Sequence, residues 1–162
     1  MGKTVLCLLI VLSATALVCE DAVLVRNIES AIRVAEPDWK CVHGVWNGPP
    51  PDVPSEKRLV LSIWLHTAKD GTHEKVVLDI SQVDSRESAK LSLRAVREAK
   101  VAPGWTVQPY RIGEEGYLCT AETGSRYEIH FRKNTTIVRV KSDSLELTQR
   151  FAGHAEGEIP SE

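Results

Sequence analysis

The sequence lacks the short motifs that mark common metal and catalytic sites. Its five histidines occur in no HxH or HExxH arrangement, and its cysteines form no CxxC pair, the spacings by which metal ligands are usually recognised. It has no Gly-x-Ser-x-Gly elbow and no SxxK motif, so no serine nucleophile is indicated. These absences predict no metal, no cofactor and no catalytic residue, unless residues far apart in the sequence converge in the fold.

The chain also lacks an excess of charge of either sign. Its 20 Lys and Arg residues and 22 Asp and Glu residues give a net charge of −2. Proteins that bind nucleic acids or anionic membranes usually carry a basic balance or a basic stripe. Nucleic acid is therefore not an expected partner.

The N-terminus contains a long apolar run, residues 4–12, preceded by Lys3 and followed by small residues at 13–16. This order is typical of a secretory signal peptide, and we predict one over residues 1–16 with cleavage after Ala16. An uncleaved anchor would need about 20 apolar residues, and lipidation of Cys19 is a third alternative. The protein is therefore predicted to be exported, as a secreted, periplasmic or cell-envelope protein without stable membrane insertion after cleavage. Residues 20–160 then form a single domain.

Cysteine is scarce, with four residues in the chain. Only Cys41 and Cys119 lie clearly inside the predicted domain, far apart in sequence. An oxidising compartment favours pairing them, so we predict a structural disulfide between the two.

Hydrophobic periodicity predicts the secondary structure. Residues 21–35 have helical spacing and stop before Pro37, and residues 58–66 are apolar on both faces, as in a central strand covered on two sides. Asp70-Gly71 predicts a hairpin. Asp84 with Glu87 and Asp143 with Glu146 form two capping boxes, each opening a helix. Further strands are expected at 39–46, 76–80, 105–111, 117–121, 127–132 and 136–141. The order predicts an α+β fold, an antiparallel β-sheet covered by amphipathic helices in a single compact domain.

The C-terminal half contains a turn at Ile112-Gly113-Glu114-Glu115-Gly116-Tyr117, then strands at 127–132 and 136–140 and a closing helix. This part resembles small exported PsbP-like α/β sandwich domains, which often carry an acidic turn before an aromatic residue and an Arg-Lys-Gly-Asn hairpin tip. Here the tip is Arg132-Lys133-Asn134-Thr135, without the glycine. The resemblance implies a sandwich fold and a non-catalytic role.

Candidate binding residues come from strand alternation and from tryptophan. In 127–132, alternation places Glu128, His130 and Arg132 on one face, which we expect to be wet or ligand-facing. Arg139 could extend that face as a cross-strand neighbour, so an unknown protein or anionic ligand is a possible partner. Trp46, beside a proline-rich loop at 47–57, is a candidate exposed contact.

Two functions stay open at this point. The first is an exported, non-catalytic binding or interaction domain. The alternative is a small secreted hydrolase whose groups, Glu114, Glu115, His130 and Arg132, assemble only in the fold. A deep pocket with a His and a carboxylate within hydrogen-bond reach would favour the hydrolase, and a shallow polar sheet face would favour binding. Asn134-Thr135-Thr136 is an N-glycosylation acceptor if the host is eukaryotic.

Overall fold

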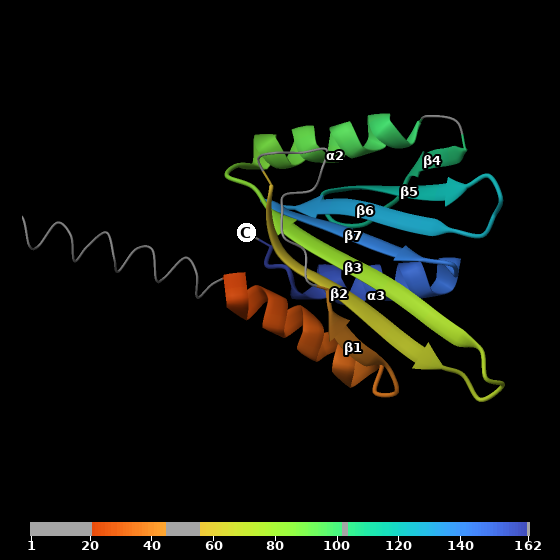
Figure 1. Ribbon diagram of the computed structural model, residues 1–162. Coiled ribbons are helices and arrows are strands. Elements are labelled where there is room, and N and C mark those ends of the chain that lie inside the picture. Colours follow the sequence, from red (N-terminus) through yellow and green to blue (C-terminus); the bar gives the residue numbers. More distant parts are fainter. Residues whose placement is uncertain (1–20, 45–55, 102–103, 162) are drawn as a thin grey trace, which may run out of the picture.

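The computed structural model describes residues 21–44, 56–101 and 104–161. They form an antiparallel sheet of seven strands in the order β1-β2-β3-β7-β6-β5-β4, with helices packed on it (Figure 1). The elements are helix 21–35, β1 (Lys40–His43), β2 (Lys57–Thr67), β3 (His73–Gln82), α2 (Arg86–Lys100), β4 (Trp105–Pro109), β5 (Glu115–Ala121), β6 (Tyr127–Lys133), β7 (Thr136–Ser142) and α3 (Leu145–Glu158). The predicted α+β single-domain fold is confirmed. The predicted signal peptide, Cys19 and Trp46 lie outside the described residues.

Helices cover both faces of the sheet. On the face that we call the inner face, Ile28 of helix 21–35 and Phe151 of α3 join Trp64, Phe131 and other apolar residues of the strands in one buried cluster. On the opposite, outer face, Ala89 of α2 packs with Val83 and Ile137 in a second cluster. Strand alternation explains this division, because successive side chains point to opposite faces.

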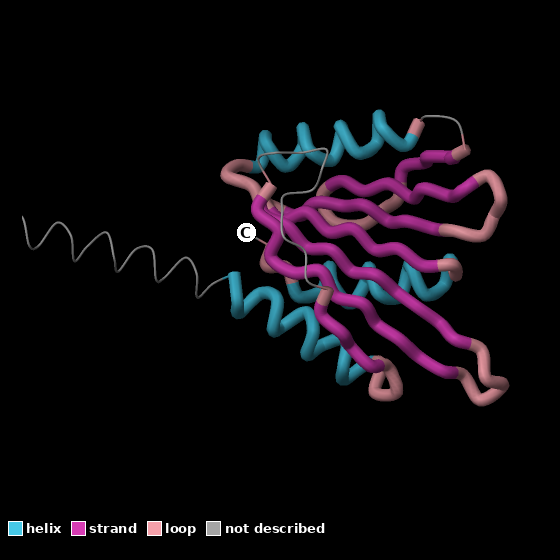
Figure 2. Tube along the Cα trace, viewed as in Figure 1, coloured by secondary structure: helices cyan, strands magenta, loops and turns pink. Residues whose placement is uncertain are grey.

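The two longest strands, β2 and β3, form a hairpin that projects beyond the neighbouring strands (Figure 2). The predicted turn is confirmed: Gly71 has a positive φ of 85°, and Asp70 Oδ1 accepts a hydrogen bond from the backbone N–H of Thr72 at 2.9 Å. The expectation that β2 is a central strand covered on both sides is wrong. It lies second from the β1 edge, and its outer-face Leu65 is 41% exposed.

Neither predicted capping box forms, because each N-cap lies one residue later than predicted and the residue three positions after it is no longer a glutamate. The N-cap of α2 is Ser85, whose Oγ accepts from the backbone N–H of Ser88, and the N-cap of α3 is Ser144, which caps Leu147 in the same way. In both places an aspartate directly precedes the serine. Either residue type can cap a helix, so the sequence alone did not distinguish them.

The predicted disulfide between Cys41 and Cys119 is wrong, since both are free cysteines. Cys41 lies on β1 and Cys119 on β5, with four strands between them in the sheet. Five strand spacings correspond to about 24 Å, far more than the roughly 6 Å between the Cα atoms of a disulfide. The two side chains also point to opposite faces.

Among the described residues, no helix has both the length and the apolar character that a membrane-spanning segment needs.

Candidate functional site

The structure brings the predicted residues His130, Arg132 and Arg139 together on the outer face. His130 is the cross-strand neighbour of Arg139, and Arg132 follows on the same strand. However, their exposed fractions are only 2%, 6% and 6%. The expectation of a wet face is therefore wrong, because strand alternation determines which residues share a face but not what lies over that face.

Arg139 belongs to a buried ion-pair network. Its Nη2 donates to both carboxylate oxygens of Glu56, at 2.7 and 2.6 Å, and its Nη1 donates to Ser81 Oγ at 3.1 Å. Ser81 in turn donates to Glu56 at 2.8 Å. Beside this group, Arg58 makes a bidentate pair with Asp79, with both distances 2.8 Å. Arg139 is thus engaged in structural contacts and is not free to bind a ligand.

His130 lies against Glu128, with Nε2 to Oε2 at 2.9 Å, while its Nδ1 is buried without a hydrogen-bond partner among the described residues. Burial, reinforced by the positive charges of Arg139 and Lys141, lowers the pKa of His130 against the opposing effect of Glu128. The imidazole is therefore neutral at neutral pH. Burial alone would raise the pKa of Glu128, but the contacts with His130, Lys141 and Lys100 outweigh it and lower that pKa.

Arg132 holds the two carboxylates of the alternative hydrolase site. Its Nη1 pairs with Glu114, and its Nε donates to Glu115 Oε2 at 3.2 Å. The backbone N–H of Asn134, followed by the Arg132 guanidinium, lowers the pKa of Glu114 although burial opposes the shift. A general acid at neutral pH needs a raised carboxyl pKa, so Glu114 is unsuited to that role. The ion pairs of this cluster instead tie β5 to β6.

Asn134, the glycosylation candidate, lies at the β6–β7 tip with a φ of 56°. Its Nδ2 donates to the carbonyl of Pro160 at 2.8 Å, and its Oδ1 accepts from Arg86 at 2.8 Å. The side-chain amide is thus already used within the fold.

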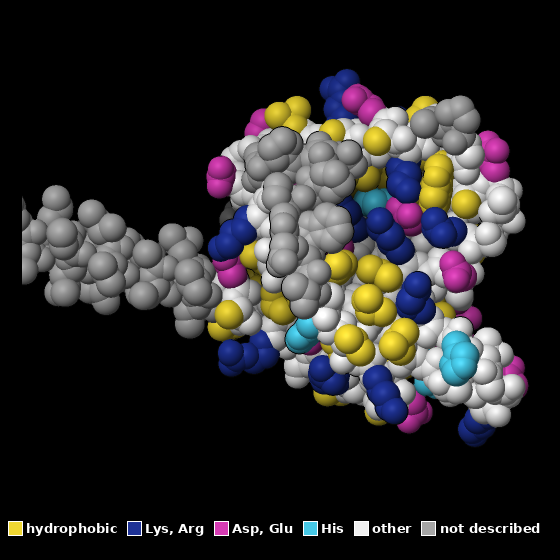
Figure 3. All heavy atoms as spheres, viewed as in Figure 1, with side chains coloured by type: hydrophobic (Ala, Val, Ile, Leu, Met, Phe, Trp, Pro, Cys, Tyr) yellow, Lys and Arg dark blue, Asp and Glu magenta, His cyan; other side chains and the backbone are white. Residues whose placement is uncertain are grey.

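A half-exposed apolar surface occupies the outer face of β1, β2 and β3. We call it the outer patch; its residues are Val42, Leu61, Ile63, Leu65 and Val77. The register places Val42, Ile63 and Val77 side by side across the three strands. Figure 3 shows hydrophobic side chains gathered over this part of the sheet, with Lys and Arg side chains around them. Sequence reasoning missed the patch because it assumed that β2 was covered on both faces.

Lysines border the outer patch. Lys40 and Lys75 flank Leu65 across the strands, and Lys141 is the neighbour of Val77 on β7. Lys40 and Lys75 are exposed, and the Lys141 side chain is 42% exposed. The outer patch therefore combines an apolar centre with a positively charged border.

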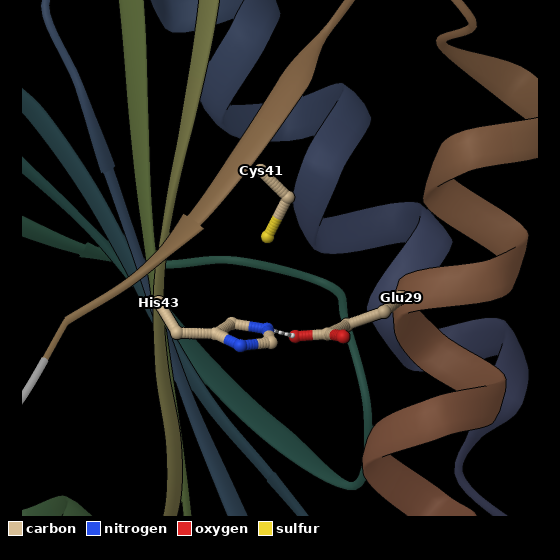
Figure 4. A group of neighbouring side chains, drawn as sticks. All are labelled: Glu29, Cys41 and His43. Carbon is tan, nitrogen blue, oxygen red and sulfur yellow. Dashed lines mark hydrogen bonds and ion pairs between the residues drawn. The ribbon is translucent and has the colours of Figure 1, made fainter.

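A second group lies on the inner side, between β1 and helix 21–35. The potential ligand atoms of Glu29, Cys41 and His43 all lie within 4.8 Å of one another. His43 Nε2 is 2.7 Å from Glu29 Oε1, and the Cys41 sulfur points toward the same space (Figure 4). Burial, then the charge of Glu29, raises the pKa of the Cys41 thiol, while Arg33 opposes the shift.

The sequence indicates one part of this three-residue group, the pair Cys41 and His43. Cys41 and His43 are two residues apart on a strand, so they share a face. Glu29 joins them only because helix 21–35 packs against that face, which spacing could not reveal.

A depression of about 970 Å³ lies beside the end of the β2–β3 hairpin and is lined by His66 and Glu74 among others. His66 Nδ1 is 2.7 Å from Glu74 Oε2. The Thr67 hydroxyl lies 3.1 Å from His73 Nδ1, but alternation puts this pair on the opposite face of the hairpin. The two pairs therefore do not combine into a nucleophile, base and carboxylate triad.

No protein-family model matches the chain, and neither the curated proteins nor the solved structures include a significant match.

Proposed function

We propose that the chain is an exported, non-catalytic binding domain whose outer patch contacts an acidic protein segment that also carries apolar side chains. The observation that carries this proposal is the composition of β2, which is apolar on both faces although helices 21–35 and α3 cover only its inner face. The resemblance to PsbP-like domains is part of this proposal. An α+β sheet with helices on both faces is compatible with that resemblance.

The exposure of the outer patch supports an external partner. Val42 is 52% exposed and Leu65 is 41% exposed, and Leu61, Ile63 and Val77 are half-buried beside them. Contiguous exposed apolar side chains rimmed by polar groups often mark interaction sites. Burial of such a surface contributes about 25 cal/mol per Å² of apolar area, so covering the patch would stabilise a complex with the partner.

The lysines around the outer patch favour an acidic partner. Lys40, Lys75 and Lys141 surround the patch, whereas the nearby carboxylates of Asp79 and Glu128 are buried and already paired. The positive border attracts a negatively charged segment and steers its approach. Single exposed lysines contribute little in isolation, so we expect the apolar centre to supply most of the affinity.

A peptide-display selection with the purified chain tests the proposal. We expect selected peptides to combine Asp or Glu with Leu, Phe or Trp, and to shift the methyl NMR signals of Val42, Ile63 and Val77. Lys40→Glu with Lys75→Glu should weaken the binding of these peptides at least about tenfold, roughly 1.4 kcal/mol. Lys90→Glu on α2, in an exposed pair with Glu87, is the matched charge control and should change the affinity little.

The proposal would be overturned if no peptide is selected, if the selected peptides lack acidic residues, or if the signal shifts are confined to other surfaces. Binding of anionic lipid vesicles in place of peptides would also contradict it. The hydrolase alternative has less support because its proposed carboxylates are tied to Arg132.

Export is a separate part of the proposal, supported by the apolar run at 4–12 after Lys3. N-terminal sequencing of protein recovered outside the cytoplasm should begin near Leu17. An intact Met1 on that material would contradict cleavage.

A further inference from the structure

We propose that Glu29, Cys41 and His43 form a binding site for a divalent transition metal ion, with Zn²⁺ as the best fit. The three residues come from two elements that are separate in the sequence, and the fold brings their ligand atoms within 4.8 Å of one another. This site is independent of the outer patch, because Cys41 and His43 point to the inner face of β1 (Figure 4).

The donor set selects the metal. A thiolate, an imidazole and a carboxylate together suit Zn²⁺, which accepts sulfur, nitrogen and oxygen ligands. Mg²⁺ and Ca²⁺ prefer oxygen ligands only. Three protein ligands leave the fourth position of a tetrahedral zinc ion for water or another ligand, as in sites that act on or bind a further molecule.

The geometry requires small adjustments. Around a tetrahedral zinc ion the ligand atoms lie about 3.3–3.6 Å apart, given metal–ligand distances of roughly 2.0–2.3 Å. The 2.7 Å contact between His43 and Glu29 must therefore open by about half an ångström to an ångström, and the sulfur must approach. Side-chain rotamers of Glu29 and Cys41 can supply these movements, whereas strand β1 fixes only the backbone positions of Cys41 and His43.

Access and partial burial suit an ion. The His43 side chain is 61% exposed and that of Glu29 only 14%, so the group opens to solvent on one side and is sheltered on the other. The positive charge of Arg33, whose guanidinium lies over the Trp64 ring at 5.4 Å from the centroid, opposes a bound cation. The negative charges of the Glu29 carboxylate and the Cys41 thiolate offset this repulsion.

Cobalt substitution tests the site. The full chain is purified without metal under reducing conditions, with Cys7→Ser and Cys19→Ser in every variant so that only Cys41 and Cys119 can supply a thiolate. Co²⁺ should produce a sulfur-to-cobalt charge-transfer band and the visible ligand-field bands of a tetrahedral site. One equivalent of Zn²⁺ should displace the Co²⁺ and remove these bands. Cys41→Ser should abolish the charge-transfer band.

The controls separate this site from chance binding. Cys119→Ser and His73→Gln remove the same residue types elsewhere and should leave the spectrum unchanged. His43→Gln changes an exposed residue and should keep the fold by circular dichroism while weakening Co²⁺ at least about tenfold, as losses at metal sites typically do; Glu29→Gln should act likewise. The proposal would be overturned if no charge-transfer band appears, if the band persists in Cys41→Ser, or if folded His43→Gln binds Co²⁺ with unchanged affinity.

Discussion

Replacing Arg139 by methionine should strongly destabilise the fold. The substitution keeps a long side chain but removes the guanidinium that makes two short contacts with Glu56 and one with Ser81. The Glu56 side chain is fully buried, so its charge would be left without its principal partner. Breaking a buried ion pair in this way costs about 3–5 kcal/mol, a large part of the roughly 5–15 kcal/mol that stabilises a typical domain.

Urea unfolding followed by circular dichroism measures this loss as a change in the free energy of unfolding at constant slope. Arg94→Met is the matched control: Arg94 also pairs with a glutamate, Glu98, at 2.8 Å, but the two side chains are 71% and 64% exposed. That change should cost less than about 1 kcal/mol.

A second variant separates the buried charge from lost packing. Glu56→Gln combined with Arg139→Met removes both charges and should recover part of the loss, since an apolar or neutral replacement of a whole pair is often tolerated. If Arg139→Met costs no more than Arg94→Met, the buried network does not stabilise the domain and the reasoning from burial fails.

Three further predictions concern titration and backbone strain. Burial lowers the pKa of His130 below its ordinary 6.5, so as the pH falls the unfolded chain is protonated at this histidine before the folded chain is. The free energy of unfolding should therefore be highest above about pH 6.5 and decrease below it. Urea titrations at several pH values should show this decrease in the wild-type chain and lack it in His130→Gln. Burial raises the pKa of Cys119 to about 11, so iodoacetamide should label the less buried Cys41 faster in the native protein, and equal labelling rates by mass spectrometry would contradict this. Gly113→Ala should lower the free energy of unfolding by at least about 1 kcal/mol, because φ is 60° and the new Cβ would lie 2.4 Å from the backbone oxygen of Arg132. The new Cβ in Gly71→Ala meets no atom within 4 Å, so an equal loss in the two variants would show that the close contact at Gly113 relaxes.

Strands β6 and β7 show what strand alternation can predict and what it cannot. Alternation correctly placed Glu128, His130 and Arg132 on one face and Ile129 and Phe131 on the other. It did not reveal that carboxylates and helix α2 lie over the polar residues. Exposure depends on elements that are distant in the sequence, and a local pattern contains no information about them.

Hydrophobic periods, the Asp70-Gly71 turn and helix-capping residues act over a few neighbouring positions, so they were sufficient to predict the α+β fold class. Which distant residues meet depends instead on how the helices and strands pack. The strand order separates Cys41 from Cys119, and the packing of helix 21–35 on β1 brings Glu29 to Cys41 and His43. These contacts follow from how whole faces are buried against one another, and burial is a property of the assembled sheet and helices, not of any one segment.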